Sequence, residues 1–397
     1  MKYYKTVYEI LQDHLPSQIL SKIVEENDTD EYRKKFTALR HLNTMMYAHL
    51  TEKKGLEDIE IGIKSDMKLQ EHTGTISDSQ LSRVNSQRDP EVFKAVFEAT
   101  VRELGKHDGI RLIPGQYGIL KVLDSTLVRL CTSLFPWANY RSTTAGVKIH
   151  TLYNLLLDAP EMIVLTEGAL HDKKMMPEII TESGVTYIFD RAYLDHNLWD
   201  NYCENEIFFV SRLKDNAIFE VVGENFVADG SNVLSDKIVI LGCNSKKMRF
   251  PVRLAEVIDS SNGEVFYIVT NRFDLTADEI ADIYRLRWSI ECFFKWIKQH
   301  LKIKKFYGTS FNAILNQIYS AMILYCLLKL FHILYCKKSD FLSMVRAIAY
   351  APWYTLAELM LVLIPAKKQK RSKHKRFNWK EEYKDIIKEY NLIDLYL

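Results

Sequence analysis

One segment, residues 284–298, combines cations, aromatic residues and a single carboxylate at helical spacing. It contains no Pro or Gly, and Thr276 followed by acidic residues is typical of a helix N-terminus. On a helix that turns about 100° per residue, Tyr284, Arg287 and Glu291 share one face. The opposite face is apolar, with Leu286, Ile290, Phe293 and Ile297. The pattern predicts one helix that buries one side and presents a lone acid among cations on the other.

This polar face suits a metal ligand beside a nucleic-acid backbone, because cations neutralise phosphate charge. An ordinary amphipathic surface helix is the alternative, but such a helix rarely places Tyr and Trp on its polar side. We therefore predict that this face contacts DNA, with five candidate side chains: Tyr284, Arg287, Trp288, Lys295 and Lys298.

Two further acids follow predicted β-strands. An alternating segment ends at Asp124, and a short apolar segment ends at Asp190. Together with Glu291 they are suited to hold two divalent cations about 3.5–4 Å apart, the arrangement that favours phosphodiester cleavage. Carboxylate ligands fit Mg²⁺, with Mn²⁺ as a substitute. Each aspartate also has a plainer explanation, since Asp124 can cap a turn and Asp190 can pair with Arg191.

The order of the predicted elements indicates an α/β fold in which these acids can meet. Three strands joined by short turns form an antiparallel meander, and two more strands follow, each after a helix. We expect these strands at 117–124, 146–153, 161–165, 185–190 and 206–212, and the helices at 172–183 and 193–202. This order is that of the ribonuclease-H-like fold, in which strand one, strand four and a later helix contribute the acids. Further strands are predicted at 217–222, 236–241, 248–257 and 265–270.

The chain before this core, up to about residue 105, has helical periodicity. Its segment 75–88 resembles a short DNA-recognition helix that Ser77 or Asp78 caps. Arg83 and Arg88 are its candidate DNA contacts. A polar connector between helices is an equally good interpretation.

The chain after the acid-bearing helix is also predicted to be helical, with buried helices over 309–364. Its uncharged apolar run, 318–328, is too short to span a bilayer, so we expect a core helix and no membrane. The run 367–376 holds seven cations and no acid; such a run is usually a solvated linker, and in a DNA enzyme it would also track phosphate. The tail 379–397 is amphipathic.

Composition sets the broad class. Of 397 residues, 47% are hydrophobic and 26% charged, which is typical of a soluble globular protein. The net charge of +2 is small, so binding to a polyanion would depend on local clusters. Six scattered cysteines with no CxxC pair argue against structural zinc and disulfides, and they fit a reducing cytoplasm. The N-terminal residues are not followed by an apolar segment of the signal-peptide kind.

The spacing Tyr284-x2-Arg287-x3-Glu291-x6-Lys298 resembles, residue for residue, the signature helix of the IS4-family DDE transposases of bacterial insertion sequences. Other blocks are also similar to that family: Asp124-Ser-Thr, Tyr140-Arg141, Gly146-Val-Lys-Ile-His150, and Asp190-Arg-Ala-Tyr193 with Trp199 beyond. The resemblance covers roughly residues 75–335. Strands inserted before the signature helix are a further shared feature.

The resemblance implies an enzyme that cleaves at the ends of its insertion sequence and joins the 3′-hydroxyl ends to target DNA. Such cut-and-paste transposition often passes through a hairpin end, and it is usually carried out by a homodimer on paired ends. Partners would be double-stranded DNA at the terminal inverted repeats and at the target, in the bacterial cytoplasm on nucleoid DNA.

Residue roles also follow from the resemblance. Asp124, Asp190 and Glu291 would be the metal ligands. Tyr284, Arg287 and Lys298 would hold phosphates, and Trp288 would support a flipped base. Further DNA contacts are expected from four residues: Arg141, Lys148, His150 and Arg191. For His150 a structural role is the alternative.

We predict five regions along the chain: a helical DNA-binding domain (1–110), the first part of the catalytic core (111–214), a β-strand insertion (215–272), the second part of the core (273–335) and a helical C-terminal region with the basic linker (336–397). Two other functions stay open from sequence. One is a nuclease of the same fold without strand transfer, and the other is a non-catalytic DNA-binding relative.

Overall fold

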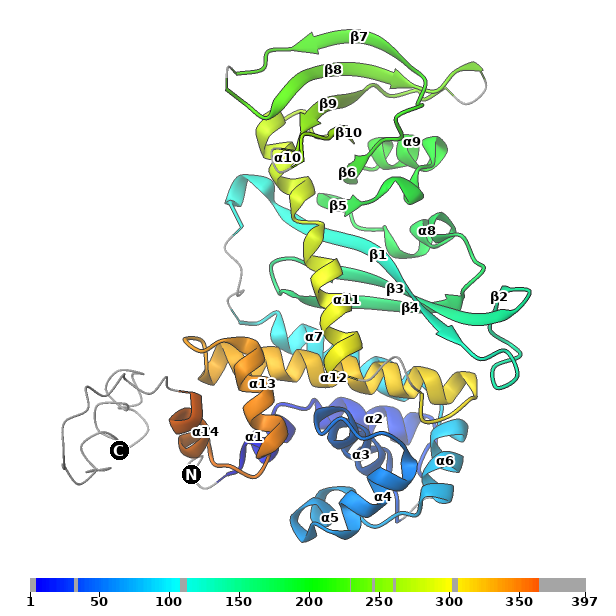
Figure 1. Ribbon diagram of the computed structural model, residues 1–397, viewed down its shortest axis with the longest axis vertical. Coiled ribbons are helices and arrows are strands. Elements are labelled where there is room, and N and C mark those ends of the chain that lie inside the picture. Colours follow the sequence, from blue (N-terminus) through cyan, green and yellow to red (C-terminus); the bar gives the residue numbers. More distant parts are fainter. Residues whose placement is uncertain are drawn as a thin grey trace, which may run out of the picture. The chain divides into compact units, whose positions relative to one another are not determined.

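The computed structural model describes residues 5–31, 35–107, 113–228, 230–244, 247–259, 262–301 and 306–363. Within these residues one mixed sheet runs through the chain (Figure 1). Its strands are β1 (Ile119–Leu130), β2 (Asn139–Arg141), β3 (Thr144–Asn154), β4 (Ala159–Glu167), β5 (Val185–Phe189), β6 (Phe208–Arg212), β7 (Phe219–Asn225), β8 (Val233–Leu241), β9 (Val252–Ile258) and β10 (Val265–Thr270).

The pairing of the first strands confirms the predicted ribonuclease-H-like core. β1 pairs antiparallel with β3, and β3 pairs antiparallel with β4. On its other edge β1 pairs parallel with β5, and β5 pairs parallel with β6. Val122 and Leu123 of β1 point to opposite faces of the sheet and both are fully buried, as expected for a strand that is covered on both faces.

The predicted inserted strands continue this sheet. β10 pairs antiparallel with β6, and β9, β8 and β7 follow in that order. The insertion therefore extends the core by backbone hydrogen bonds, and β7 is left as the edge strand.

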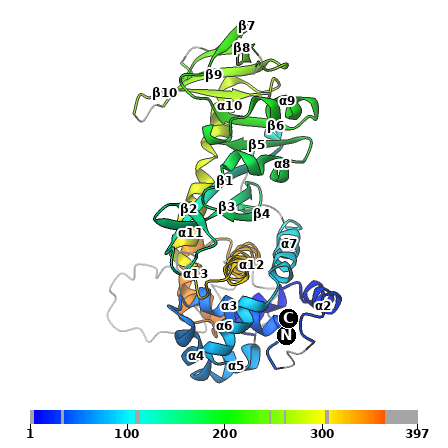
Figure 2. The same cartoon turned by 90° about the vertical axis from the view of Figure 1, so that its right-hand side faces the viewer.

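Helices cover the two faces of the sheet (Figures 1 and 2). On one face lie α10 (Ala277–Arg285) and α11 (Trp288–His300), and α11 crosses β1. On the other face lie the short helices η3 (Asp172–Met175), α8 (Met176–Ile179), η4 (Arg191–Tyr193) and α9 (His196–Glu204). A cluster of buried side chains centred on Trp199, Phe189 and Phe209 fills this second face.

The sequence pattern predicted one continuous acid-bearing helix, but the structure has two consecutive helices, α10 and α11. Thr276 caps α10 with a reciprocal capping box to Glu279, but α10 ends at Arg285 and α11 begins at Trp288. At this junction the N–H of Arg287 donates to the carbonyl of Tyr284, so the backbone tightens to three-residue hydrogen bonds. The angular layout of a single straight helix therefore does not hold across the junction, and Tyr284 belongs to the first helix.

Two other predicted boundaries were wrong. Asp124 does not end its strand, because β1 runs to Leu130. What ends before Asp124 is the parallel pairing of β1 with β5, whose last pair is Val122 with Ile188. The helix expected over 172–183 is one short turn and one short helix that ends at Ile179.

Helices also make up the predicted N-terminal region. They are α2 (Ser17–Glu26), α3 (Ala38–Leu50), α4 (Leu56–Lys64), α5 (Met67–Thr73), α6 (Asp78–Gln87) and α7 (Glu91–Leu104). Ser77 caps α6 by accepting from the N–H of Gln80, which confirms one of the two predicted caps. His49 of α3 is fully buried, and its ring bonds the carbonyl of Leu301 at 2.8 Å and that of Gln317 at 3.0 Å.

The predicted apolar core helix is longer than expected. α12 (Phe311–Tyr335) has 25 residues and is long and apolar enough to cross a membrane by length and composition. However, 83% of its most apolar window is buried inside the protein. Burial of that kind is what the core helix of a globular protein shows.

Residues 5–15 and 330–363 form a separate compact unit. It contains α1 (Val7–Asp13), α13 (Phe341–Tyr350) and α14 (Leu356–Leu363) together with the end of α12. Thr6 caps α1 through a capping box with Glu9, and the N–H of Val7 donates to the carbonyl of Tyr354. The basic run 367–376 and the tail 379–397 lie outside the described residues.

A buried arginine ties the start of α10 to the core. Arg272 is 5% exposed and donates to the carbonyl of Tyr117 at 3.0 Å, to the Thr186 hydroxyl at 2.6 Å and to Asp274 at 2.7 Å. Its guanidinium also lies over the Phe208 ring. Arg272 therefore joins the segment before β1, strands β5 and β6, and the segment that leads into α10.

We expect Arg272→Met to lower the free energy of unfolding by roughly 2–3 kcal/mol, because it leaves two buried acceptors, the carbonyl of Tyr117 and the Thr186 hydroxyl, without their donor. The matched control is Arg285→Met. Arg285 is more than half exposed and pairs with Asp282 within α10, so its loss should change stability by less than about 1 kcal/mol. Urea unfolding of both variants measures the difference, and equal effects would contradict the role of Arg272.

Candidate active site

Asp124 and Glu291 lie on either side of one guanidinium. Arg287 Nη2 is 2.6 Å from Glu291 Oε1, and Arg287 Nη1 is 3.9 Å from Asp124 Oδ2. All three side chains are mostly buried, with exposures of 33% for Glu291 and 21% for the other two. Asp124 comes from β1 and the other two from the beginning of α11, which crosses that strand. The cation holds two carboxylates from distant parts of the sequence close together.

Asp190 joins them from the end of β5. Val122 pairs with Ile188, so Asp124 and Asp190 each follow two residues after a paired position on neighbouring parallel strands. Asp190 Oδ1 accepts from the N–H of Ala192 at 2.8 Å, and Asp124 Oδ1 accepts from the N–H of Ser125 at 2.7 Å. One oxygen of each aspartate is thus fixed by its own backbone.

The electrostatics of Asp124 reflect this crowding. The pKa of its carboxyl is raised from 3.8 to about 7. Burial is the main cause, and the charges of Asp190 and Glu291 add to it, against the opposing effects of the Ser125 N–H and Arg287. Like charges that approach one another in a poorly solvated place disfavour ionisation unless a cation compensates them. The site is therefore short of positive charge even with Arg287 present.

The three acids fit a divalent cation by the chemistry of their donor set, since oxygen ligands and excess negative charge are what Mg²⁺ and Mn²⁺ prefer. They do not form a finished cage. Within the described ranges no three His, Cys, Asp or Glu side chains converge closely enough to hold an ion, and Glu291 is engaged by Arg287. An ion would exchange with Arg287 for the Glu291 carboxylate.

Aromatic and cationic side chains surround these acids on the same side of the sheet. The Arg287 guanidinium lies 5.8 Å from the centre of the Tyr284 ring, which contacts Phe266 of β10. Lys298 donates to the Thr126 hydroxyl on β1. Trp288 is 63% exposed and Lys295 is exposed. The five residues that were predicted from the helix pattern therefore lie on α10, on α11 or at the junction between them. Trp288 and Lys295 are the exposed ones.

Three other predicted DNA contacts are exposed: Arg83 on α6, Arg141 on β2 and Arg191 directly after Asp190. Arg141 lies over the ring of Tyr140. Their exposure is compatible with DNA contact, which stays a prediction.

Arg88, by contrast, is fully buried. Its guanidinium donates to Asp30 at 3.0 Å and to the carbonyl of Phe36 at 3.4 Å. It supports the packing of the N-terminal helices, and its prediction as a DNA contact does not fit this position.

Lys148 and His150 also differ from their predicted role. His150 is fully buried, and its Nε2 bonds the Thr166 hydroxyl at 2.9 Å. Lys148 donates to the carbonyl of Leu170 at 2.6 Å and lies 3.3 Å from Asp172. Both point to the face of the sheet opposite α11, because side chains alternate along a strand and Ser125, not Asp124, is the register partner of His150. The structural alternative for His150 is the one that this geometry supports.

Sequence reasoning missed two residues beside the acids. Asp172 was expected inside a helix, but it accepts from the Ser125 hydroxyl at 2.6 Å. Tyr193 is buried, and burial together with the charges of Asp124, Asp172 and Asp190 raises the pKa of its phenol. No spacing signal marks Asp172; its only cue is a position shortly after the third strand of the meander.

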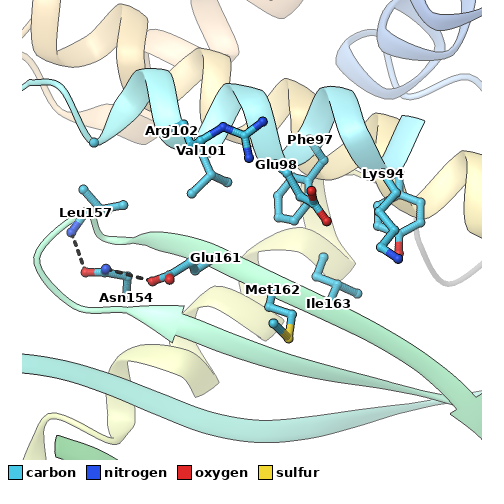
Figure 3. A pocket seen from close by; sticks show the side chains of 12 residues that line it. Lys94, Phe97, Glu98, Val101, Arg102, Asn154, Leu157, Glu161, Met162 and Ile163 are labelled. Carbon is cyan, nitrogen blue, oxygen red and sulfur yellow. Dashed lines mark hydrogen bonds between the residues drawn. The ribbon is translucent and has the colours of Figure 1, made fainter. Parts of the chain in front are cut away.

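A separate cavity of about 380 Å³ lies between α7 and the β3–β4 hairpin (Figure 3). Two of its polar groups are paired: Asn154 donates to Glu161 at 2.9 Å, and Glu161 also accepts from Lys121 at 2.7 Å. None of the three acids lines it. The cavity gives no support to an additional reactive centre.

Comparison with known families decides the classification. The model described as "Transposase DDE domain" matches residues 119–327, which is more than half of the chain and includes all three acids. The chain belongs to the DDE transposase family. A second model, for a domain of unknown function (DUF4372), matches residues 4–76 of this DDE transposase.

Three relatives carry transposase names. A protein from Sinorhizobium fredii named as transposase y4zB is 36% identical over 53% of this chain and 60% of its own length. The probable transposase for insertion sequence element IS5377 from Geobacillus stearothermophilus is 36% identical over 53% of this chain and 56% of its own length. A protein from Synechocystis, named as a transposase for insertion sequence element IS4SA, is 30% identical over 64% and 72%. The match thus spans somewhat more than half the length of the first two.

Among solved structures, a piggyBac transposase synaptic complex with hairpin DNA aligns with a TM-score of 0.46 and 10% identity, over 94% of this chain and 88% of that one. The likeness is too low to support a statement about this DDE transposase.

We expect Asp124→Asn to stabilise the metal-free protein relative to wild type, by an amount that grows from about pH 4 to pH 7 and then levels off. The folded-state pKa of Asp124 is raised to about 7 from 3.8, so the native state loses stability as pH rises through this window and the carboxyl is forced to ionise. The gain in the free energy of unfolding from Asp124→Asn is at most about 4 kcal/mol. Urea unfolding in EDTA measures the stability of both proteins across this pH range. A stability difference that does not grow with pH would contradict the raised pKa of Asp124 as its cause.

Proposed function

We propose that this protein is a transposase that cleaves DNA at the ends of its insertion sequence and joins the 3′-hydroxyl ends to target DNA. The observation that carries the proposal is the meeting of Asp124, Asp190 and Glu291 beside Arg287 in a DDE-family chain. Three carboxylates that crowd one another cost stability, and neither packing nor DNA binding requires them. A reaction that uses their negative charge explains them.

DDE transposases generally use divalent metal ions, and we propose Mg²⁺ here, with Mn²⁺ as a substitute. Asp124, Asp190 and Glu291 would hold the ions, which when bound supply Lewis acidity for in-line displacement at a phosphodiester. The chain's own part is to hold these oxygens in place: Ser125 and Ala192 fix one oxygen of each aspartate through their N–H groups.

The cations near the acids would bind the scissile strand. Arg287 presents a planar fork that suits phosphate, and Lys298 is held on β1 by Thr126. Tyr284 supports Arg287 from α10, and the exposed ring of Trp288 is available for stacking on an unpaired base. We propose this side of α10 and α11 as the place where the transposon end binds, with Lys295, Arg141 and Arg191 at its margins.

The other predicted partners and boundaries belong to the same proposal. The helical N-terminal region would bind the terminal inverted repeats, and a homodimer would pair the two ends, through a hairpin intermediate where one forms. We place the action on nucleoid DNA in the cytoplasm. The five regions predicted from sequence stay the proposed division of the chain.

Cleavage of a DNA fragment that carries the element's own end, in Mg²⁺, tests the function. We expect wild type to cut and Glu291→Gln to bind the fragment but lose at least about 100-fold of the cleavage rate. Glutamine keeps the shape while removing the charge that retains metal. The matched control is Asp282→Asn, an exposed acid on α10 that pairs with Arg285 and should cut like wild type.

Each result separates one function from the others. Cleavage by both wild type and Glu291→Gln at equal rates would overturn the role of Glu291. Binding without cutting by wild type would favour the non-catalytic relative. Cutting without joining the 3′-hydroxyl to a target would favour the nuclease.

If Arg83 contacts phosphate, Arg83→Ala should weaken binding to the same fragment. It should also reduce the slope of log affinity against log salt concentration by about 1. Fluorescence anisotropy across a salt series measures both. Lys106→Ala is the control, since Lys106 is an exposed cation that pairs with Glu103. Equal effects of the two variants would show that Arg83 acts only through general charge.

A further inference from the structure

A polar cluster lies on the face of β1 opposite the acids. It consists of Ser125, Lys148, His150 and Asp172. Asp172 Oδ1 accepts from the Ser125 hydroxyl at 2.6 Å and lies 3.7 Å from His150 Nδ1, and Lys148 Nζ is 3.3 Å from its carboxylate. Asp172 is 21% exposed and Lys148 15%, so this is a largely desolvated ion pair. The proposed function has no use for these four residues as direct DNA contacts.

Ser125 connects this cluster to the proposed metal ligand Asp124. Neighbouring residues of a strand point to opposite faces, so the Ser125 side chain turns to Asp172 while Asp124 turns to α11. The N–H of Ser125 nevertheless donates to Asp124 Oδ1 at 2.7 Å. One residue thus holds a carboxylate on each face, by its hydroxyl on one side and its backbone on the other.

The charges of the cluster are balanced without His150. Burial lowers the pKa of the His150 imidazole to about 4, so near neutral pH the ring is uncharged and Lys148 alone compensates Asp172. Lys148 is itself fixed by the carbonyl of Leu170. The Asp172 carboxylate is therefore held by side chains from β1 and β3. Its hydrogen bond with the Ser125 hydroxyl anchors Ser125, and with it the backbone of β1 beside Asp124.

We propose that Asp172 is a positioning residue of the reacting centre: through the Ser125 hydroxyl it fixes the Ser125 N–H that orients Asp124 for its cation. This inference rests on the proposed function. Groups that orient a metal-binding carboxylate in this way change the affinity for the metal without touching it, typically by about 10- to 100-fold.

The test is the affinity of the full chain for Mn²⁺, measured by electron paramagnetic resonance without DNA and therefore without turnover. We expect Asp172→Asn and Ser125→Ala each to weaken Mn²⁺ binding by about 10-fold or more. Ser125→Thr keeps the hydroxyl and should bind nearly as wild type. Because the two changes break one chain of contacts, the double variant should be little worse than either single one.

Asp158→Asn is the matched control. Asp158, in the turn between β3 and β4, is a carboxylate of similar exposure, 28%, that pairs with a buried lysine, Lys329, at 2.6 Å. It should lower thermal stability about as much as Asp172→Asn does and leave Mn²⁺ affinity unchanged. A loss of Mn²⁺ binding in Asp158→Asn would show that destabilisation alone accounts for the effect and would overturn the inference.

The remaining outcomes are distinct. If only Asp172→Asn weakens Mn²⁺ binding and Ser125→Ala does not, the charge of Asp172 acts directly and the positioning chain is wrong. If neither variant changes an affinity that Asp124→Asn abolishes, the inference fails while the metal assignment stands. If wild type binds no Mn²⁺ that depends on Asp124, the metal assignment in the proposed function fails first.

Discussion

The repulsion between carboxylates at the sheet–helix junction is the constraint on which the site depends. Asp124, Asp190 and Glu291 approach closely enough for burial and mutual repulsion to raise the pKa of Asp124 to about 7. Arg287 compensates only part of this charge, and it does so through a 2.6 Å ion pair with Glu291. The fold accepts an electrostatic cost here that a purely structural protein would avoid, and a divalent cation is the natural compensation.

The fold keeps the three carboxylates close together by anchoring each of them on a different element. Asp124 and Asp190 lie beside each other because β1 and β5 are parallel neighbours, and Glu291 meets them because α11 crosses β1. Arg272 fixes the segment that leads into α10 by hydrogen bonds to core strands and loops. A junction of three-residue hydrogen bonds then links α10 to α11. Rigid anchoring of this kind is what keeps like charges from separating.

The opposite face of β1 adds a second layer of support. Ser125 is shared between Asp124 and Asp172, and Lys148 neutralises Asp172 in a largely desolvated ion pair. Lys148, which the sequence analysis predicted to contact DNA, thus supports the sheet from the face opposite the acids. The same strand residues that alternate between faces therefore divide into a reactive side and a supporting side.

The sequence by itself determined the family, the order of the core strands and the three acids, because hydrophobic period, turn residues and the spacing Tyr284 to Lys298 are local properties. It could not decide what depends on distant contacts. Only the tertiary structure showed that Asp124 lies within its strand, that the signature helix is interrupted at Leu286–Arg287, and that Arg88 and His150 are buried. The role of Asp172 was equally invisible, since it arises from a hydrogen bond between residues 47 positions apart in the chain. The identity of a charged residue in the sequence does not tell whether its side chain faces solvent or a buried partner, because tertiary packing decides this.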